Sequence, residues 1–266
     1  MVRANPNAPV LDAKNVMIRF GGLTAVSEFN LTIEPRELVG LIGPNGAGKT
    51  TIFNMLTGVY KPTEGEIRFA GVPTAGMKPY QITALGVART FQNIRLFREL
   101  SVLDNVLIGG HIHCRYSGAA AVLKTNRFVA AEGVAEDEAM ALLEIFGLAS
   151  RAHGYAKNLP YGDQRRLEIA RALAVRPNLL LLDEPAAGLN DRETHDLMHT
   201  IHEIRDRFGI AILLIEHNME LVMGICERIL VVSFGRTIAQ GTPESVRANP
   251  VVIEAYLGEP VEGAQA

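Results

Sequence analysis

The sequence predicts an α/β fold in which a parallel sheet is covered by helices on both faces. From residue 179 to residue 232, short apolar segments alternate with longer amphipathic ones, the order of strands and helices in such folds. The segments 179–182 and 210–215 are continuously apolar and bounded by charges, as expected for strands buried on both faces. A third observation is a glycine-rich loop directly after the largely apolar strand predicted at 37–42. Loops at this edge of an α/β sheet are where ligands bind.

The segments before that loop predict an antiparallel hairpin. Residues 10–20 and 24–33 alternate partly between apolar and polar, and Gly21 and Gly22 supply the turn between them. Residues 66–70 and 87–91 read as short strands, and residues 48–56 as the helix that leaves the glycine-rich loop. We therefore expect an N-terminal antiparallel β subdomain beside the parallel sheet.

The middle of the chain is helical in its periodicity. One helix is predicted before Gly147 by residues that recur at helical spacing, namely Val134, Glu138, Ala139, Leu142, Leu143, Ile145 and Phe146. The stretch 111–129 fits either a loop or an exposed helix. Residues 163–176 predict another helix, which Pro177 stops.

The last third of the chain has the most regular order. It predicts strands at 179–182, 210–215 and 228–232, with helices at 191–207 and 218–224 between them. Residues 243–257 fit two short helices. Residues 1–9 look like a polar leader, and residues 259–266 are expected to fray.

Composition excludes some classes of function. The formal net charge of -3 gives no global basic field, so nucleic acid is not expected as a partner. Cys114 and Cys226 lie far apart and form no CxxC motif, which favours a reducing compartment. No apolar run is long enough for a signal peptide or a membrane span. A role at a membrane would therefore need a partner that spans it.

The glycine-rich loop matches the phosphate-binding pattern G-x-x-x-x-G-K-[ST] and lies between a predicted strand and a predicted helix. Its glycines let backbone N–H groups turn towards phosphate oxygens, and the helix N-terminus adds its positive end. Lys49 would reach the β- and γ-phosphates, Thr50 would offer a hydroxyl to Mg²⁺, and Thr51 would lie near the α-phosphate. The expected ATP-binding residues are Gly43, Pro44, Asn45, Gly46, Ala47, Gly48, Lys49, Thr50 and Thr51.

Two acids follow the apolar strand at 179–182. Asp183 lies where the strand ends and is a candidate ligand of Mg²⁺, through water. Glu184 is a candidate to orient or deprotonate the attacking water. The simpler alternative is a solvated acidic turn before Pro185, which the phosphate loop upstream disfavours.

With these residues in place, the chain resembles the nucleotide-binding cassettes of ABC transporters, which have a P-loop NTPase core. The segment from Leu159 to Arg166, including Tyr161, Gly162 and Asp163, is similar to the family's signature segment. The resemblance implies that Gln92 contacts Mg²⁺ and the attacking water, and that His217 contacts the γ-phosphate. It also implies that Phe20 lies against adenine.

The resemblance further implies a pair of cassettes packed head to tail, each signature segment closing on ATP held by the other. Pro160 and Tyr161 replace a serine and a glycine of the family pattern, so the contact with phosphate would rest on the Gly162 backbone and the helix end. Asn190 replaces an aspartate, which would alter the coupling between the two cassettes.

Several segments narrow the resemblance to the branched-chain amino-acid importers, and within them to the larger ATPase subunit. They are residues 89–97, 161–169, 186–190, 216–219 and 255–258. This implies permease subunits, a sister cassette or second copy, and a periplasmic binding protein. It also implies a location on the cytoplasmic face of the bacterial inner membrane. The related substrates urea, amides and other amino acids stay open.

The resemblance also implies a division of the chain. Residues 10–95 and 178–242 would form the RecA-like core with its β subdomain, residues 96–177 the helical subdomain, and residues 243–266 a tail.

Four questions remain open at this point. A soluble cassette acting on ribosomes or DNA usually has two cassettes or a long coiled coil, and neither occurs here; a small-molecule kinase would need a lid and no signature segment. Ile94, Leu96 and Phe97 fit either a groove for a permease helix or ordinary packing. His195, His199 and His202 share one helix face and could hold zinc, but no acidic or cysteine cluster accompanies them.

Overall fold

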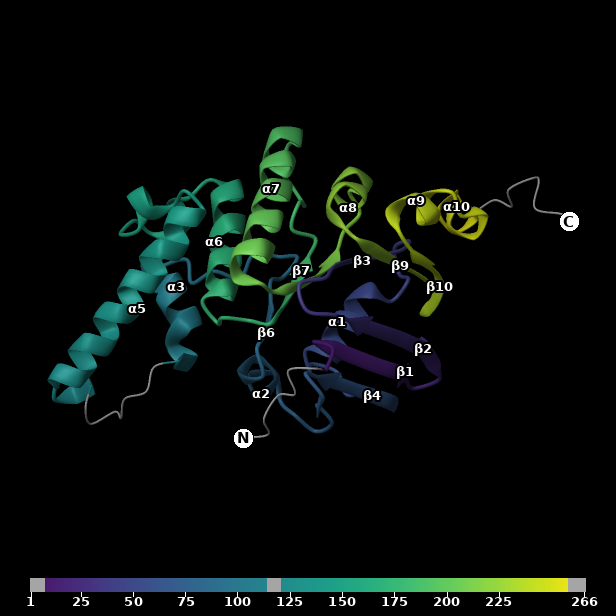
Figure 1. Cartoon of the computed structure of the whole chain (residues 1–266), viewed down its shortest axis with the longest axis horizontal. Coiled ribbons are helices and arrows are strands. Elements are labelled where there is room, and N and C mark those ends of the chain that lie inside the picture. Colours follow the sequence, from purple (N-terminus) through teal and green to yellow (C-terminus); the bar gives the residue numbers. More distant parts are fainter. Residues whose placement is uncertain (1–7, 114–120, 258–266) are drawn as a thin grey trace, which may run out of the picture. The chain divides into compact units, whose positions relative to one another are not determined.

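The structure is a computed structural model that describes residues 8–113 and 121–257. It divides into two compact units, one formed by Met1–Arg89 with Asn178–Ala266 and the other by Thr90–Pro177 (Figure 1). Each unit is described by itself. The predicted helical subdomain begins at residue 96, whereas the second unit begins at Thr90; the predicted assignment of subdomains stays a prediction.

The first unit is built on a six-stranded sheet with the order β10-β9-β3-β8-β7-β6. Its strands are β3 (Leu38–Ile42), β6 (Val87–Arg89), β7 (Leu179–Asp183), β8 (Ala211–Ile215), β9 (Arg228–Ser233) and β10 (Arg236–Gly241). All neighbours are parallel except β10, which is antiparallel to β9. The predicted parallel sheet is confirmed, but β10 was missed because residues 236–241 are mostly half-buried or exposed and carry little apolar signal. β6 ends at Arg89, two residues before the predicted end at 91.

A second sheet is antiparallel, with the order β2-β1-β4-β5. It consists of β1 (Leu11–Phe20), β2 (Leu23–Ile33), β4 (Glu64–Phe69) and β5 (Val72–Pro73). The predicted hairpin is confirmed, with Phe20 opposite Leu23 across the turn. Its buried positions are apolar, which is why the partial alternation was visible in the sequence.

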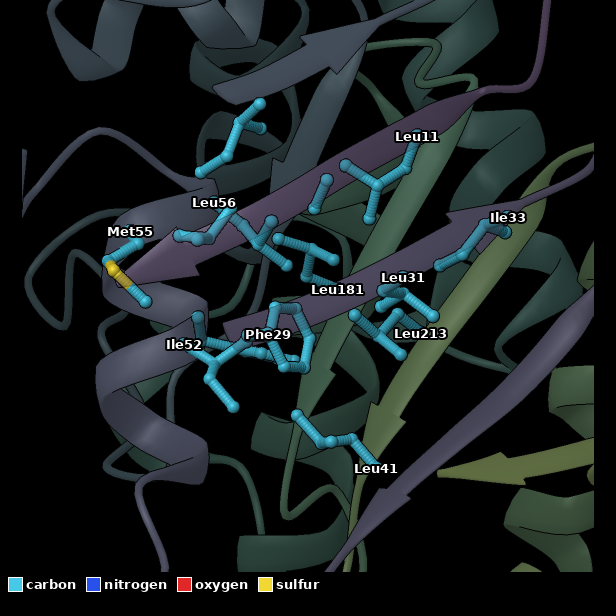
Figure 2. Packing of buried hydrophobic residues seen from close by; sticks show 14 of the residues in the cluster. Leu11, Phe29, Leu31, Ile33, Leu41, Ile52, Met55, Leu56, Leu181 and Leu213 are labelled. Carbon is cyan, nitrogen blue, oxygen red and sulfur yellow. The ribbon is translucent and has the colours of Figure 1, made fainter. Parts of the chain in front are cut away.

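The main core lies between the two sheets. Phe29, Leu31 and Ile33 of β2 pack with Leu41, Leu181 and Leu213 of the six-stranded sheet, and Figure 2 shows them together with helix α1 (Lys49–Leu56). Ile52, Met55 and Leu56 are the core residues of α1 that the figure labels. Because α1 follows the phosphate loop, the burial of these residues fixes the loop to the sheet.

The other face of the six-stranded sheet is covered by α7 (Asp191–Phe208) and α8 (Met219–Ile225), opposite α1 in Figure 1. Because both faces of the sheet are covered, β8 is apolar throughout and β7 is apolar at every position before Asp183. The unit also contains α2 (Pro79–Ala84), which the sequence did not predict. The two predicted C-terminal helices are confirmed as α9 (Pro243–Arg247) and α10 (Pro250–Leu257).

The second unit is helical. It consists of α3 (Val102–Gly110), η1 (His111–His113), α5 (Asn126–Ile145), η2 (Ala149–Arg151), η3 (Ala156–Asn158) and α6 (Tyr161–Leu173). The predicted apolar face of α5 is wrong in its first half, since Val134 is 58% exposed while Ala139, Leu143 and Phe146 are buried. The prediction for 163–176 was shifted: α6 begins at Tyr161 and ends at Leu173. Part of the stretch 111–129, including Cys114, lies outside the described residues.

Candidate functional site

The phosphate loop connects the end of β3 to the start of α1. The Lys49 ammonium group lies inside the loop, where it donates hydrogen bonds to the carbonyl oxygens of Gly43 at 2.6 Å and Pro44 at 2.9 Å. Lys49 is 6% exposed. Thr50 and Thr51 follow in the first turn of α1, where Thr50 is exposed. The backbone therefore curls around one buried cation, as a loop that binds phosphate must.

Two glycines in this loop have no substitute. Gly43 has φ 153°, and a Cβ there would lie 2.0 Å from the Val232 carbonyl oxygen of β9. Gly48 precedes α1 with φ 105°, and a Cβ there would lie 3.1 Å from the Ala25 carbonyl oxygen. The loop is thus wedged between β9 and β2, and only residues without a side chain fit these two positions.

Burial lowers the pKa of Lys49, although the negative charges of Glu184 and Asp183 act in the opposite direction. A buried ammonium group whose hydrogen bonds go only to carbonyl oxygens is poorly compensated for the water it has lost. An anion entering the loop would supply the missing charge. The electrostatics of the loop therefore favour a phosphate-bearing ligand.

Asp183, the last residue of β7, is held by an arginine that the sequence did not assign to the site. Arg89 at the end of β6 donates a hydrogen bond from Nη2 to Asp183 Oδ2 at 2.7 Å, and both side chains are buried. Arg89 Nη1 also donates to Asn54 Oδ1 of α1 at 2.8 Å. One guanidinium group thus connects the acidic strand end to the helix that follows the phosphate loop. The pairing of β6 with β7 is what brings the two residues together.

Glu184 and His217 meet across the ends of β7 and β8. His217 Nε2 lies 2.8 Å from Glu184 Oε1, and the Glu184 N–H donates to the Ile215 carbonyl oxygen at 2.9 Å. The Glu184 side chain is 16% exposed and that of His217 is 41% exposed. The two predicted residues are therefore in contact and reachable from solvent.

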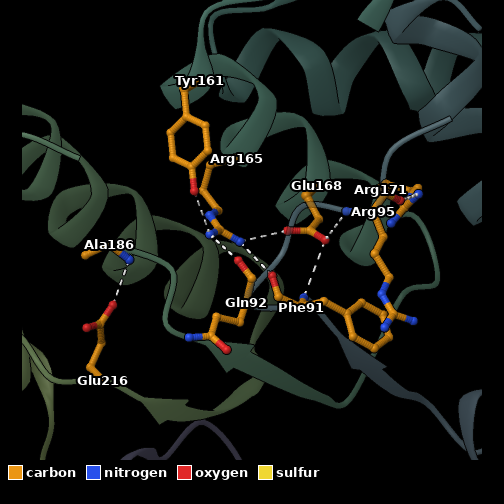
Figure 3. Close-up of polar contacts among 9 residues, drawn as sticks. All are labelled: Phe91, Gln92, Arg95, Tyr161, Arg165, Glu168, Arg171, Ala186 and Glu216. Atoms are coloured by element: carbon orange, nitrogen blue, oxygen red, sulfur yellow. Dashed lines mark hydrogen bonds and ion pairs between the residues drawn. The ribbon is translucent and has the colours of Figure 1, made fainter. Parts of the chain in front are cut away.

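A further acid, Glu216, was missed as a site residue although it precedes His217. It is 3% exposed and accepts three hydrogen bonds from backbone N–H groups, those of Ala186, His217 and Asn218, at 2.7, 2.9 and 3.2 Å. Figure 3 shows the contact with Ala186. Glu216 therefore connects the turn after Glu184 to the turn that carries His217. A lone acid after an apolar strand was the only signal in the sequence.

Phe20 lies at the end of β1 and is 45% exposed. Its ring packs edge-on against Tyr60, with the ring centres 5.3 Å apart. An exposed ring held by an aromatic neighbour offers a flat apolar surface.

The remaining predicted residues belong to the second unit. Gln92 is exposed in the loop after β6, and its carbonyl oxygen accepts a hydrogen bond from Arg165 Nη2 at 2.8 Å. Tyr161, Gly162 and Asp163 form the first turn of α6; Asp163 pairs with Arg151 at 2.6 Å. Pro160 is the N-cap of that helix. Phe97, part of the predicted groove, is 48% exposed.

Two further sets of residues from the sequence analysis lie on α7 or at its N-cap, namely the histidines and Asn190. Asn190 caps α7 by accepting a hydrogen bond from the Glu193 N–H at 3.0 Å, a position that asparagine and aspartate fill equally well. His195 and His199 contact each other, with Nε2 atoms 3.1 Å apart. No group of three or more histidine, cysteine or acidic side chains suited to a metal occurs in residues 8–113 and 121–257.

Comparison with known proteins identifies the family. A profile described as ABC transporter matches residues 26–187, and one described as branched-chain amino acid ATP-binding cassette transporter matches residues 236–262. The high-affinity branched-chain amino acid transport ATP-binding protein LivG of Escherichia coli is 52% identical over 94% of this chain and 98% of its own. BraF of Pseudomonas aeruginosa, of the same description, is 48% identical over the same shares. LptB of Haemophilus influenzae, a lipopolysaccharide export ATP-binding protein, is 34% identical over 94% and 98%.

Solved structures agree with the sequence comparison. The ADP conformation of an ATP-binding cassette of an ABC transporter matches with a TM-score of 0.81 at 29% identity, covering 95% of this chain and all of that one. A nucleotide-free cassette matches with the same TM-score over 94% of this chain. None of the helices in the described part of the chain is long and apolar enough to cross a membrane. The chain belongs to the ABC transporter family, as an ATP-binding cassette of its branched-chain amino-acid group.

Proposed function

We propose that this chain binds and hydrolyses ATP to power the uptake of branched-chain amino acids through partner permeases. The observation that carries the proposal is the arrangement of the first unit. Its phosphate loop, acidic strand end and Glu184–His217 pair all follow the carboxyl ends of strands in one sheet. The 52% identity to a branched-chain amino acid transport protein supports the substrate class.

ATP binding begins with the buried ammonium group of Lys49. The β- and γ-phosphates would replace the carbonyl oxygens of Gly43 and Pro44 as its partners, while backbone N–H groups of the loop bind the remaining oxygens. Phe20 would stack on the adenine ring. The exposure of nearly half of its surface supports this role.

The donor set also fits Mg²⁺, which prefers oxygen ligands and keeps several of its waters. Asp183 would hold it through water, with the Thr50 hydroxyl and the Gln92 side chain as the other ligands. When bound, the ion would neutralise charge that develops on the phosphates. The buried ion pair with Arg89 holds the Asp183 carboxylate in place at the strand end.

For hydrolysis, Glu184 would orient and deprotonate the attacking water. In this structure its Oε1 is in contact with His217 Nε2. A γ-phosphate near His217 would offer that nitrogen a more highly charged partner, and Glu184 would then be free to bind water. Glu216 would fix Glu184 and His217 relative to each other, because its carboxylate holds the two turns that carry them.

The site would be completed by a second cassette, either a sister subunit or a second copy of this chain. Tyr161, Gly162 and Asp163 would close on the γ-phosphate held by the partner's loop, using the positive end of α6. ATP would then join the two cassettes, and its hydrolysis would let them separate. The pair would sit on the cytoplasmic face of the bacterial inner membrane, bound to permeases that receive amino acids from a periplasmic binding protein.

The Glu184→Gln variant tests the chemistry. We expect it to bind ATP with unchanged affinity, to lose at least about a hundredfold in kcat, and to accumulate as an ATP-bound dimer on size exclusion. Glu220→Gln, an exposed acid in the first turn of α8, is the matched control and should keep wild-type turnover. Wild-type hydrolysis by Glu184→Gln would remove Glu184 from its role.

Purification from membranes tests the partners. We expect a tagged chain to bring permease subunits and a sister cassette with it. The alternative, a soluble cassette acting on nucleic acid or ribosomes, predicts co-purification with ribosomes or DNA and no membrane subunits. Crosslinking of Lys49 to Gly162 positions across two chains, with a slowly cleaved ATP analogue present, tests the shared site.

A further inference from the structure

The second unit buries an arginine–glutamate pair that the proposed reaction does not use. Arg165 and Glu168 lie on the same face of α6, three residues apart, and each side chain is 1% exposed. Arg165 Nη1 lies 3.0 Å from Glu168 Oε2. Burying two charges is unfavourable unless further hydrogen bonds satisfy them, so their other partners indicate what the pair does.

Those partners are backbone atoms of a single loop, the one that follows β6 and carries Gln92. Arg165 donates from Nη1 to the Phe91 carbonyl oxygen at 2.7 Å and from Nη2 to the Gln92 carbonyl oxygen at 2.8 Å. Glu168 Oε1 accepts from the N–H groups of Arg95 at 3.1 Å and Phe91 at 3.4 Å. Figure 3 shows these four contacts converging from α6 on the loop.

The same arginine also contacts the start of its own helix. Arg165 Nη2, which donates to Gln92, lies 3.3 Å from the Tyr161 hydroxyl group. Tyr161 is the first residue of α6 and part of the signature segment. One guanidinium group thus joins the backbone of Gln92 to the turn that contains Tyr161 and Gly162. Hydrogen bonds of charged groups are about twice as strong as neutral ones, so this connection is stiff.

We propose that Arg165 and Glu168 are positioning residues that fix the Gln92 loop to the start of α6, so that Gln92 and the signature segment move as one piece. This rests on the proposed function for the role of Gln92 in hydrolysis. The division of the chain supports it, because the second unit begins at Thr90 and includes the whole loop. Gln92 would therefore follow α6 and not the strand that precedes it.

Kinetics of Glu168→Gln give the first test. This change keeps the shape of the side chain but removes the charge, and it leaves one acceptor oxygen for three donors, which are the Phe91 and Arg95 N–H groups and Arg165 Nη1. Since the phosphate loop lies in the other unit, we expect KM for ATP to change less than about twofold while kcat falls about tenfold. The matched control is Glu138→Gln, which removes the charge from the exposed ion pair of Glu138 with Arg176 in the same unit. Glu138→Gln should keep wild-type kcat.

Amide hydrogen exchange tests the loop directly. We expect the Phe91 and Arg95 amides to exchange at least about tenfold faster in Glu168→Gln, while those of Ile169 and Ala170 inside α6 stay protected. Protection within α6 separates a released loop from an unfolded unit. Unchanged exchange at Phe91 and Arg95 would overturn the proposal. If Glu168→Gln does not fold, Arg165→Lys, which keeps the charge but loses the fork geometry, is measured in its place.

A double-mutant cycle shows whether the pair acts through Gln92. If it does, Glu168→Gln added to Gln92→Ala should leave kcat where Gln92→Ala alone leaves it. Losses that simply multiply would overturn the proposal, because a general structural defect acts in both backgrounds. Wild-type kcat in Gln92→Ala would instead contradict the proposed role of Gln92, and the exchange rates would still decide whether the pair holds the loop.

Discussion

The backbone of Glu184 lies in the left-handed region, at φ 47°, which residues other than glycine seldom adopt. Two hydrogen bonds hold it there: its N–H donates to the Ile215 carbonyl oxygen, and its carbonyl oxygen accepts from Ala187 at 3.1 Å. Strained conformations of this kind concentrate at functional sites, where the surrounding structure compensates for them. At Glu184 this conformation turns the side chain away from the direction of β7 and towards His217.

Lys49 gives a prediction that depends on pH. Burial lowers its pKa below the usual value of about 10.5, and bound phosphates should raise it again. At pH values between the pKa of Lys49 in the free protein and its pKa in the ATP complex, the protein should take up a proton when ATP binds. We expect calorimetry in buffers of different ionisation heat to detect proton uptake on ATP binding that grows as the pH rises from 7 to 9, because free Lys49 loses its proton as the pH rises. Buffer-independent heats at both pH values would contradict this.

The same shift has a defined sign for folding. The folded state loses the Lys49 proton at lower pH than the unfolded state. This group therefore makes the free energy of unfolding rise with pH, until the pH passes the pKa that Lys49 has in the unfolded chain.

Glu216 gives a prediction about stability and activity together. Glu216→Ala would leave one buried and two partly buried N–H donors without their acceptor, so we expect the free energy of unfolding to fall by about 3 kcal/mol. Displacement of His217 and the turn after Glu184 should also lower kcat at least about tenfold, with KM for ATP little changed. Denaturant titration and steady-state kinetics measure the two effects. Glu220→Ala on the exposed side of α8 is the control, and equal losses in both variants would refute the assignment.

At the scale of elements, the contact between α8 and β3 has a measurable consequence. Cys226 follows α8, is 5% exposed, and its Sγ atom lies 3.0 Å from where a Cβ of Gly40 would be. Burial raises the pKa of the Cys226 thiol to about 12. Since the thiolate is the reactive form, we expect the Cys226 peptide to resist alkylation at pH 8 in the folded protein and to react once urea unfolds it. Rapid alkylation without denaturant would show that α8 separates readily from β3.

Strands and helices with strong patterns were predictable from the sequence. The apolar runs that became β7 and β8 and the capped helix α7 lie within two residues of their expected bounds. β10 was not, because an edge strand packed on one side needs no apolar run. The early start of α6 was missed because Pro160 and Tyr161 are weak helix signals; in the structure Pro160 is the N-cap and Tyr161 the first residue of the helix.

The residues of the candidate site also divide into those that the sequence predicted and those that it did not. Lys49, Asp183, Glu184 and His217 stand in or next to motifs, so their types and spacing were informative. Arg89 and Glu216 act through partners that are distant in sequence, such as Asp183 and Ala186, and a single sequence holds no record of such pairs. Their burial, and not their spacing, is what reveals them.

At the scale of the whole chain, the two units share the proposed work unequally. The first contains the phosphate loop and both acids, and the second contains Gln92 and the signature segment. The sequence indicated two kinds of secondary structure in these regions, but the boundary at Thr90 depends on tertiary contacts that periodicity does not encode.

The order of strands in the sheet also determines how early the phosphate loop can fold while the chain is being synthesised. β3 leads into the phosphate loop, yet its two neighbours are β8 and β9, which the ribosome makes far later. Nascent chains that stop before Ser233 should therefore fail to capture a photoreactive ATP, however long they are held, and longer ones should succeed. Until β8 and β9 have been made, β3 and its phosphate loop lack both neighbouring strands of the sheet, and the nascent chain stays exposed to chaperones.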